Sequence, residues 1–459
     1  MHQSCQIRLD PTYMLCHLWL MVAKNVLIST DRQAQETEVG IAELDAALSS
    51  DQTLKSIVAG LPREVIEGVR RSLATERRGL SEAVEAYQQA KQGDATALKS
   101  RAGNDPGALL IAARIIRRLS QKELARKLGL REQQIQRYEA ERYRSISLHG
   151  FKKVASVLGA QIAIDLSSRN LEWTVSHEAP KGEELSKVLR HARAHGWLED
   201  DQTGEKSDEK AISQLVRYVA DHVLHHGTPS LLRAGLNAVA DPGSDWALLS
   251  WKAQVTRVAE GIIAESKPRY RSIDVSWLTD LVRLSRLDDG PIRARDMLLE
   301  HGIVLVVEPH IVGMKIDGAA FLVDGVPVIG LTILRDYIDN FWFTLLHEVG
   351  HVVLHYWTGL SSGFFDDMSS ADVDEFENEA NIFSGNLFIP EEVWRQSPAR
   401  ISRSPEPIER FAQKLGIHPA IVFGRIRLER NDHSIFATKV GRGQIRRQLF
   451  NLELRQPTR

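Results

Sequence analysis

Two histidines and a glutamate lie within a long apolar segment, and this feature constrains the fold more than any other. Residues 341–354 contain no proline, and their apolar side chains keep helical spacing rather than the alternation of a strand. His347 and His351 are four positions apart, so a helix places both imidazoles on one face. Glu348 directly follows the first histidine. The segment therefore predicts a largely apolar helix with one polar cluster.

Two imidazoles arranged in this way can bind one zinc ion. A glutamate beside the first can hold and deprotonate a water molecule at the metal. The sequence HEVGH thus predicts a zinc metallopeptidase site, with His347 and His351 as ligands and Glu348 as the general base. The alternative is a helix whose histidines are only packed, but chance HExxH sequences rarely lie inside an apolar helix.

A catalytic zinc site needs a third protein ligand and one open position. His355 lies two helical turns beyond the first histidine, a rise of roughly 12 Å, so we expect it to pack at the helix end instead. A second helix, near residues 374–387, offers Glu377 and Asn381 beside its buried stripe. We expect Glu377 to be the third ligand and Asn381 to orient a ligand histidine. Glu379, on a different face, is the second choice.

These segments resemble the ImmA/IrrE family of metallo-endopeptidases. The resemblance covers about residues 291–430 and is clearest in three stretches: FTLLHEVGH (343–351), ENEANIF (377–383) and LFIP (387–390). Ser384 departs from the alanine that is usual at its position. The resemblance implies a zincin-like domain with zinc ligands His347, His351 and Glu377 and the general base Glu348.

A zinc peptidase also needs a donor that stabilises the tetrahedral oxyanion. His418 follows Leu415-Gly416 at a predicted helix start and is one candidate for that catalytic role. A histidine that merely begins the helix explains its position equally well. The run IHPAIV (417–422) is similar to one near the end of family members that are fused to antitoxin-like regulators.

Upstream of the histidine-containing helix, the pattern is typical of strands. Residues 303–307 are mostly β-branched and predict one strand. Residues 318–323 and 326–331 predict a hairpin that turns at Asp324-Gly325. The C-terminal part is therefore expected to be a small sheet backed by helices.

A basic segment lies far upstream, in a chain whose net charge is only −2. Residues 108–160 hold twelve lysines and arginines but only four acidic residues, a local excess of eight positive charges. A basic segment in an otherwise acidic chain is typical of a module that binds a polyanion.

The basic segment also has the pattern of a helix-turn-helix. Ser120 and Glu123 predict a capping box, and Gly129 permits the turn that follows. With LSQKELA (119–125) and IQRYE (135–139), the segment resembles the Cro/repressor-type (XRE) family. The resemblance implies that Gln121 contacts a phosphate and that such proteins bind two-fold DNA sites as dimers. Glutamine, glutamate and arginine can all contact bases, so we expect the remaining DNA contacts from Arg131, Glu132, Gln133, Gln134 and Arg137. The alternatives are a bundle with a solvated basic face, or the same fold used to hold protein.

We therefore expect an α+β chain, mostly α, with five parts. These are a helical N-terminal region (1–100), a helix-turn-helix domain (101–165), a linker and helical region (166–285), the zincin-like domain (286–430) and a C-terminal tail (431–459). Residues 14–23 are apolar but too short to span a bilayer, and we interpret about the first twenty residues as an extended start. Only two cysteines occur, Cys5 and Cys16, which fits a reducing cytoplasm.

These features favour a cytoplasmic DNA-binding regulator with a zinc-dependent endopeptidase domain that cleaves a partner repressor or antitoxin. The expected partners are operator DNA, a protein substrate or toxin, and a second copy of the chain, with no membrane. The alternative is an antitoxin-like transcriptional regulator whose zinc domain is structural or sensory.

Overall fold

A computed structural model of the whole chain describes most of its residues. The described ranges are 27–49, 57–103, 105–143, 146–160, 183–198, 208–226, 242–314, 316–360 and 370–450. The expected extended start and much of the expected linker lie outside these ranges. Contacts divide the chain into an N-terminal unit (Met1–Thr53 with Leu73–Trp173) and a C-terminal unit (Leu54–Ser72 with Thr174–Arg459). The start of helix α4 (Arg63–Gln92) belongs to the C-terminal unit and the rest to the N-terminal unit.

The N-terminal unit is helical throughout its described elements. Besides α4 it contains α2 (Asp31–Ser49), α5 (Thr96–Ala102), α6 (Pro106–Ile116), α7 (Gln121–Leu128), α8 (Glu132–Ala140) and α9 (Leu148–Val157). Leu124 and Ile135, from α7 and α8, are fully buried in the same apolar core as Tyr87 and Ala90 of α4. The helix-turn-helix segment thus shares its core with the helices before it.

Short sequence signals fix the start and the end of α7. The hydroxyl of Ser120 accepts the backbone N–H of Glu123, and the Glu123 carboxylate accepts the backbone N–H of Ser120 at 2.7 Å. Gly129 ends α7 with a φ of +71°, a conformation that glycine adopts without strain. The predicted capping box and glycine turn are confirmed.

The C-terminal unit has a three-stranded sheet with helices before and after it. The helices before it are α10 (Glu183–Ala194), α11 (Asp208–His226), α13 (Pro242–Ser266), α14 (Leu278–Leu284) and α15 (Gly290–Glu300). Those after it are α16 (Ile338–His355), a π-helical turn (Tyr356–Leu360), α17 (Ser370–Phe388), α18 (Glu391–Arg395), a 3-10 turn (Pro398–Ile401), α19 (Pro405–Leu415), α20 (Pro419–Glu429) and α21 (Ile445–Leu449). None of the helices in the described ranges is both long and apolar enough to cross a membrane.

The sheet contains the hairpin expected from the sequence. Strands β1 (Val304–Val307), β2 (Gly318–Val323) and β3 (Val326–Leu331) lie in the order β1-β3-β2. β2 and β3 are antiparallel and turn at Asp324 and Gly325, both with positive φ, so the predicted hairpin is confirmed. β1 pairs with β3 in parallel. This order leaves β2 at one edge of the sheet.

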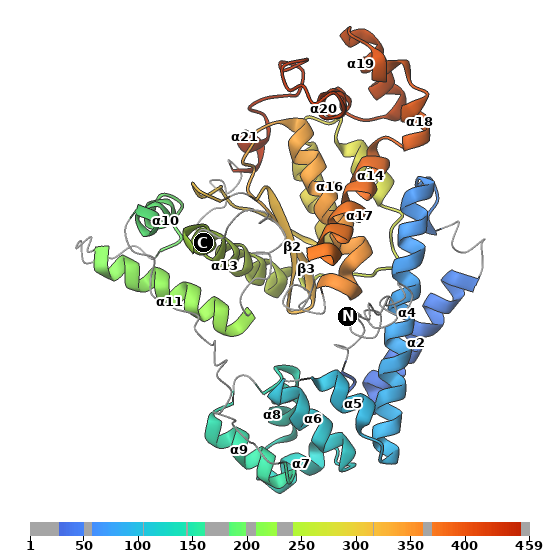
Figure 1. Cartoon of the computed structure of the whole chain (residues 1–459). Coiled ribbons are helices and arrows are strands. Elements are labelled where there is room, and N and C mark those ends of the chain that lie inside the picture. The colour runs from blue at the N-terminus through green and yellow to red at the C-terminus, as the bar shows by residue number, and fades with distance from the viewer. Residues whose placement is uncertain are drawn as a thin grey trace, which may run out of the picture. The chain divides into compact units, whose positions relative to one another are not determined.

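Helix α16 packs against β2 and β3 and also against α17 (Figure 1). Leu345, Leu346 and Val349 anchor it because their side chains are fully buried. Gly350 allows α17 to approach closely, since a Cβ at this position would lie 3.1 Å from the ring of Phe383. The polar faces of α16 and α17 are thereby brought together beside the edge strand. The α+β, mostly helical fold expected from the sequence is confirmed.

Candidate metal centre and nucleic-acid interface

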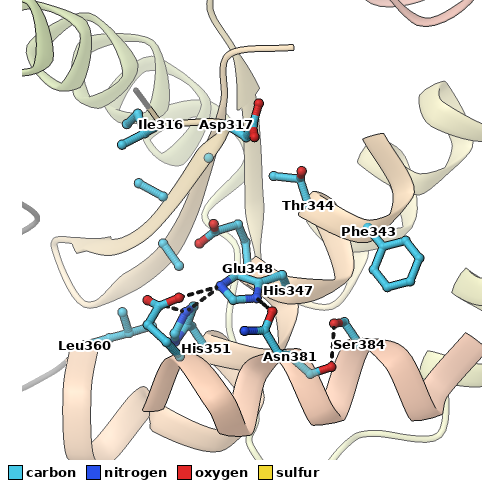
Figure 2. Close-up of a pocket in the computed structure, with 14 residues that line it drawn as sticks. Ile316, Asp317, Phe343, Thr344, His347, Glu348, His351, Leu360, Asn381 and Ser384 are labelled. Carbon is cyan, nitrogen blue, oxygen red and sulfur yellow. Dashed lines mark hydrogen bonds and ion pairs between the residues drawn. The ribbon is translucent and has the colours of Figure 1, made fainter. Parts of the chain in front are cut away.

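His347 and His351 of α16 and Glu377 of α17 each offer one metal-ligating atom, and these atoms lie within 4.8 Å of one another. Figure 2 shows the two histidines close together. The Nε2 atoms of the two histidines are 3.1 Å apart. The Glu377 carboxylate oxygens lie 3.1 Å from Nε2 of His347 and 3.4 Å from Nε2 of His351. Two nitrogens that each lie roughly 2.05 Å from a tetrahedral zinc ion would be about 3.3 Å apart. The three residues therefore fit a metal ion in both donor type and spacing.

The charge state of Glu377 also suits a metal ligand. Burial raises the pKa of its carboxyl, but hydrogen bonds to His347 and His351 outweigh burial and leave the pKa well below its usual value. Burial lowers the pKa of His347, yet its hydrogen bond to Glu377 and the charge of Glu348 leave that pKa above its usual value. The carboxylate thus stays ionised, which metal ligation requires.

Glu348 lies on the sheet side of the two histidines, in a cavity of about 340 Å³ (Figure 2). Burial raises the pKa of its carboxyl, against the opposite effect of His347 and His351. The backbone N–H of Ala320 in β2 hydrogen-bonds this carboxylate. Gly318 leaves room for it, because a Cβ there would lie 3.1 Å from Oε1 of Glu348. A buried, oriented carboxyl with a raised pKa can accept and return a proton.

Asn381 lies next to one of the two histidines. Its Oδ1 is 3.1 Å from Nδ1 of His347 (Figure 2). The other ring nitrogen, Nε2, is the one that contacts Glu377. This is the position expected for an amide that orients a ligand histidine.

His355 occupies the equivalent place behind the other histidine. Its Nδ1 lies 3.1 Å from Nδ1 of His351, and its Nε2 lies 3.0 Å from the carboxylate of Glu379. Burial lowers the pKa of His355 to about 4, so the imidazole is neutral near pH 7. Neither contact was predicted from the sequence; the i,i+4 spacing of His351 and His355 was the available signal. Glu379, the second choice for the third ligand, faces His355 and not the converging atoms.

His418 lies outside the set of residues that line this cavity. It precedes α20, where its Nδ1 accepts the backbone N–H of Ala420 at 3.1 Å. Its own backbone N–H is donated to the hydroxyl of Ser285. The role of helix cap, which the sequence left open beside the catalytic one, accounts for these contacts.

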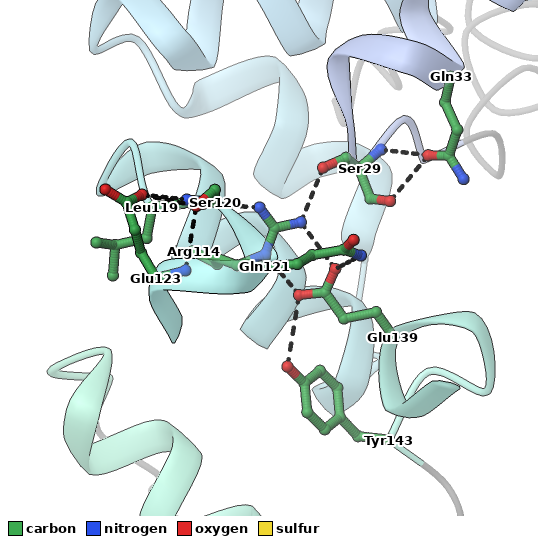
Figure 3. A network of polar contacts seen from close by, with 9 residues as sticks. All are labelled: Ser29, Gln33, Arg114, Leu119, Ser120, Gln121, Glu123, Glu139 and Tyr143. Atoms are coloured by element: carbon green, nitrogen blue, oxygen red, sulfur yellow. Dashed lines mark hydrogen bonds and ion pairs between the residues drawn. The ribbon is translucent and has the colours of Figure 1, made fainter. Parts of the chain in front are cut away.

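A buried ion pair lies at the centre of the helix-turn-helix segment (Figure 3). Arg114 donates to both carboxylate oxygens of Glu139, at 2.5 and 2.7 Å, and to the backbone carbonyls of Ser29 and Leu119. The amide of Gln121 donates to the same carboxylate at 2.8 Å. Gln121, the expected phosphate contact, is thus tied to the ion pair that joins α6 and α8.

The other residues expected to contact DNA lie at the start and along the outside of α8. Glu132, Gln133 and Arg137 are exposed, and so is Arg131 just before the helix. Gln134 is half-buried, and its side-chain oxygen accepts the backbone N–H of Arg131. Four of these five side chains are therefore accessible to a nucleic acid, whereas Gln134 also stabilises the helix start.

Two comparisons with protein families agree with these two sites. Residues 302–426 match the family model of the IrrE N-terminal-like domain, which spans the sheet, α16 and α17. Residues 110–164 match a helix-turn-helix family model. No curated protein and no solved structure matches the chain in these comparisons.

Proposed function

We propose that this chain, which carries an IrrE N-terminal-like domain of the peptidase type and a helix-turn-helix domain, is a DNA-binding regulator that cleaves a partner repressor or antitoxin with the help of zinc. The observation that supports this most directly is the convergence of His347, His351 and Glu377 beside Glu348 in one cavity. The basic helix-turn-helix segment would bind operator DNA, as a homodimer and in the cytoplasm.

A bound zinc ion would polarise the scissile carbonyl and lower the pKa of water. His347 and His351 would hold it through Nε2, and Glu377 through its carboxylate. Glu348 would accept the proton of the attacking water and pass it to the leaving amine. The edge strand β2 lines the same cavity with residues 318–320. Its outer edge can align an extended peptide through backbone hydrogen bonds.

The test compares the full-length protein with Glu348→Gln. We expect both proteins to bind one zinc ion. The substrates to test are the proteins encoded by the genes next to its own. We expect the wild type to cleave one of them, and Glu348→Gln to cleave it about 10² to 10⁴-fold more slowly, which is the usual contribution of a general base. Glu392→Gln, which changes an exposed glutamate of α18, is the matched control and should cleave normally. Wild-type protein without zinc, or equal cleavage by Glu348→Gln, contradicts the proposal.

One observation favours the alternative of a regulator whose zinc domain is structural or sensory. The described residues that line the cavity include no arginine, lysine or tyrosine, and its histidines are the two that converge on Glu377. Only Thr344, Asn381, Ser384 and backbone N–H groups remain as oxyanion donors. This alternative predicts that Glu348→Gln still binds the operator and still neutralises a toxin encoded next to it. A loss of both activities in that variant, with zinc retained, excludes it.

A further inference from the structure

We infer that Glu379 and Arg71 are positioning residues for the metal ligand His351, and that they act on it through His355. The inference rests on the zinc site proposed above, but not on whether that site turns over.

Three polar contacts connect these four residues in a row. Nδ1 of His351 lies 3.1 Å from Nδ1 of His355, and Nε2 of His355 lies 3.0 Å from one carboxylate oxygen of Glu379. Arg71 donates to the other oxygen of Glu379 at 2.9 Å. The two oxygens of one carboxylate thus serve different partners, so Arg71 fixes the orientation in which Glu379 meets His355.

Metal ligation at His351 determines which group donates and which accepts in each of these hydrogen bonds. When Nε2 of His351 binds the metal, the proton of the neutral ring is on Nδ1, and this N–H must donate. Nδ1 of His355 is then the acceptor, which places the proton of His355 on Nε2. That N–H donates to Glu379. One arrangement of protons therefore satisfies every contact, and it holds His351 in the tautomer and ring orientation that ligation needs.

The two histidine ligands differ in how many residues are hydrogen-bonded in sequence behind them. His347 meets the side chain of Asn381, a neutral amide on α17. His351 is supported by a second imidazole, then a carboxylate, then a guanidinium. A charged acceptor at the end of such a row strengthens the hydrogen bonds before it. His351 should therefore be the more firmly oriented of the two.

Arg71 is distant in sequence from the rest of the site. It lies in the start of α4, outside both segments that match a family model. Two further contacts hold this part of α4 against the end of α16. The Ser72 hydroxyl donates to the carbonyl of Val353, and a Cβ on Gly68 would lie 2.9 Å from the side chain of Leu354. A segment of the N-terminal region thus completes the surroundings of the metal site.

The contribution of each side chain to zinc affinity should fall as its solvent exposure rises. The His355 side chain is 4% exposed, Glu379 28% and Arg71 66%. Residues that support a metal ligand typically change metal affinity by about 10 to 100-fold, so His355→Ala should weaken zinc binding within this range. Glu379→Ala should weaken it about tenfold. Arg71→Ala should weaken it about two- to fivefold, because exposed ion pairs are worth little.

The test measures zinc affinity of the full-length protein by competition with a chelator, and the visible absorption spectrum of the cobalt-substituted protein. Glu379→Gln keeps an acceptor for His355 but removes its charge, so its loss should lie between those of Arg71→Ala and Glu379→Ala. The double variant Arg71→Ala/Glu379→Gln should then be no weaker than Glu379→Gln alone. Arg293→Ala removes a similarly exposed ion pair, with Asp289, and is the control that should leave zinc affinity unchanged.

Wild-type zinc affinity and cobalt spectra in both His355→Ala and Glu379→Ala overturn the inference. Equal losses in Glu379→Gln and Glu379→Ala also overturn it, since they indicate a merely structural role. A wild type that binds zinc and never cleaves a protein contradicts the proposed peptidase while the affinity series still decides this inference. A wild type that binds no zinc rejects both.

Discussion

The chain contains two buried polar clusters that differ in how their charges are satisfied. In the N-terminal unit, Arg114 is matched by Glu139 and by two backbone carbonyls, so its donors meet acceptors of the protein (Figure 3). In the C-terminal unit, one ring nitrogen each of His347 and His351 and one carboxylate oxygen of Glu377 lie within 4.8 Å of one another. The first cluster is satisfied by groups of the protein itself, whereas the second can hold a metal ion.

The largest effect is expected from breaking the saturated cluster. Glu139→Ala leaves the guanidinium of Arg114 buried without its carboxylate and should lower the unfolding free energy of the N-terminal unit by about 3 to 5 kcal/mol. Hydrogen exchange of peptides from α7 and α8 measures this, and zinc affinity should not change.

The paired replacement Arg114→Met/Glu139→Leu is the control for that variant. It removes both charges and keeps apolar volume, so it should cost much less than Glu139→Ala. If Glu139→Ala leaves exchange in α7 and α8 unchanged, the ion pair does not stabilise the helix-turn-helix fold.

The second prediction concerns the converging cluster. Zinc at about a thousandfold excess over its dissociation constant should stabilise the C-terminal unit by about 4 kcal/mol, because it binds the folded form alone. Hydrogen exchange should slow in α16 and α17, and a chelator should reverse the effect. Equal slowing in α7 and α8 would show that the two clusters do not respond separately.

The local parts of both clusters were predictable from the sequence. Each of these signals lies within a single helix. They are the spacing of His347 and His351, the i,i+4 pair Glu377 and Asn381, and the capping box at Ser120. The structure places each of these where a helix must place it. Local spacing is reliable here because a helix fixes which residues share a face.

The contacts between distant elements were not predictable in the same way. Arg71 meets Glu379 only because the start of α4 packs on α16, and no local pattern encodes that packing. The bond from Gln121 to Glu139 likewise joins two helices. The resemblance to a known family indicated a phosphate contact for Gln121, but not the ion pair that holds it.

The third prediction tests the support of a single ligand. Asn381→Ala removes the acceptor next to Nδ1 of His347 and should weaken zinc binding about tenfold, equivalent to about 1.4 kcal/mol. Competition with a chelator measures it. Asn386→Ala is the matched control on the same helix, since its side chain bonds the backbone of Ile382 and Glu391 and not a histidine of the metal site. Equal affinities in the two variants contradict a role for Asn381 in orienting His347.

The smallest effect is expected at the start of α7. Ser120→Ala removes the cap that accepts the N–H of Glu123 and should lower the unfolding free energy of the N-terminal unit by about 1 kcal/mol. Ser120→Thr keeps a hydroxyl at the cap and should recover most of the loss. Because this cap lies in the N-terminal unit and outside the metal site, zinc affinity should be identical in all three proteins, as measured by chelator competition. A change in zinc affinity on losing this one cap would mean that the two clusters are energetically coupled, and the contrast between them would then be one of degree.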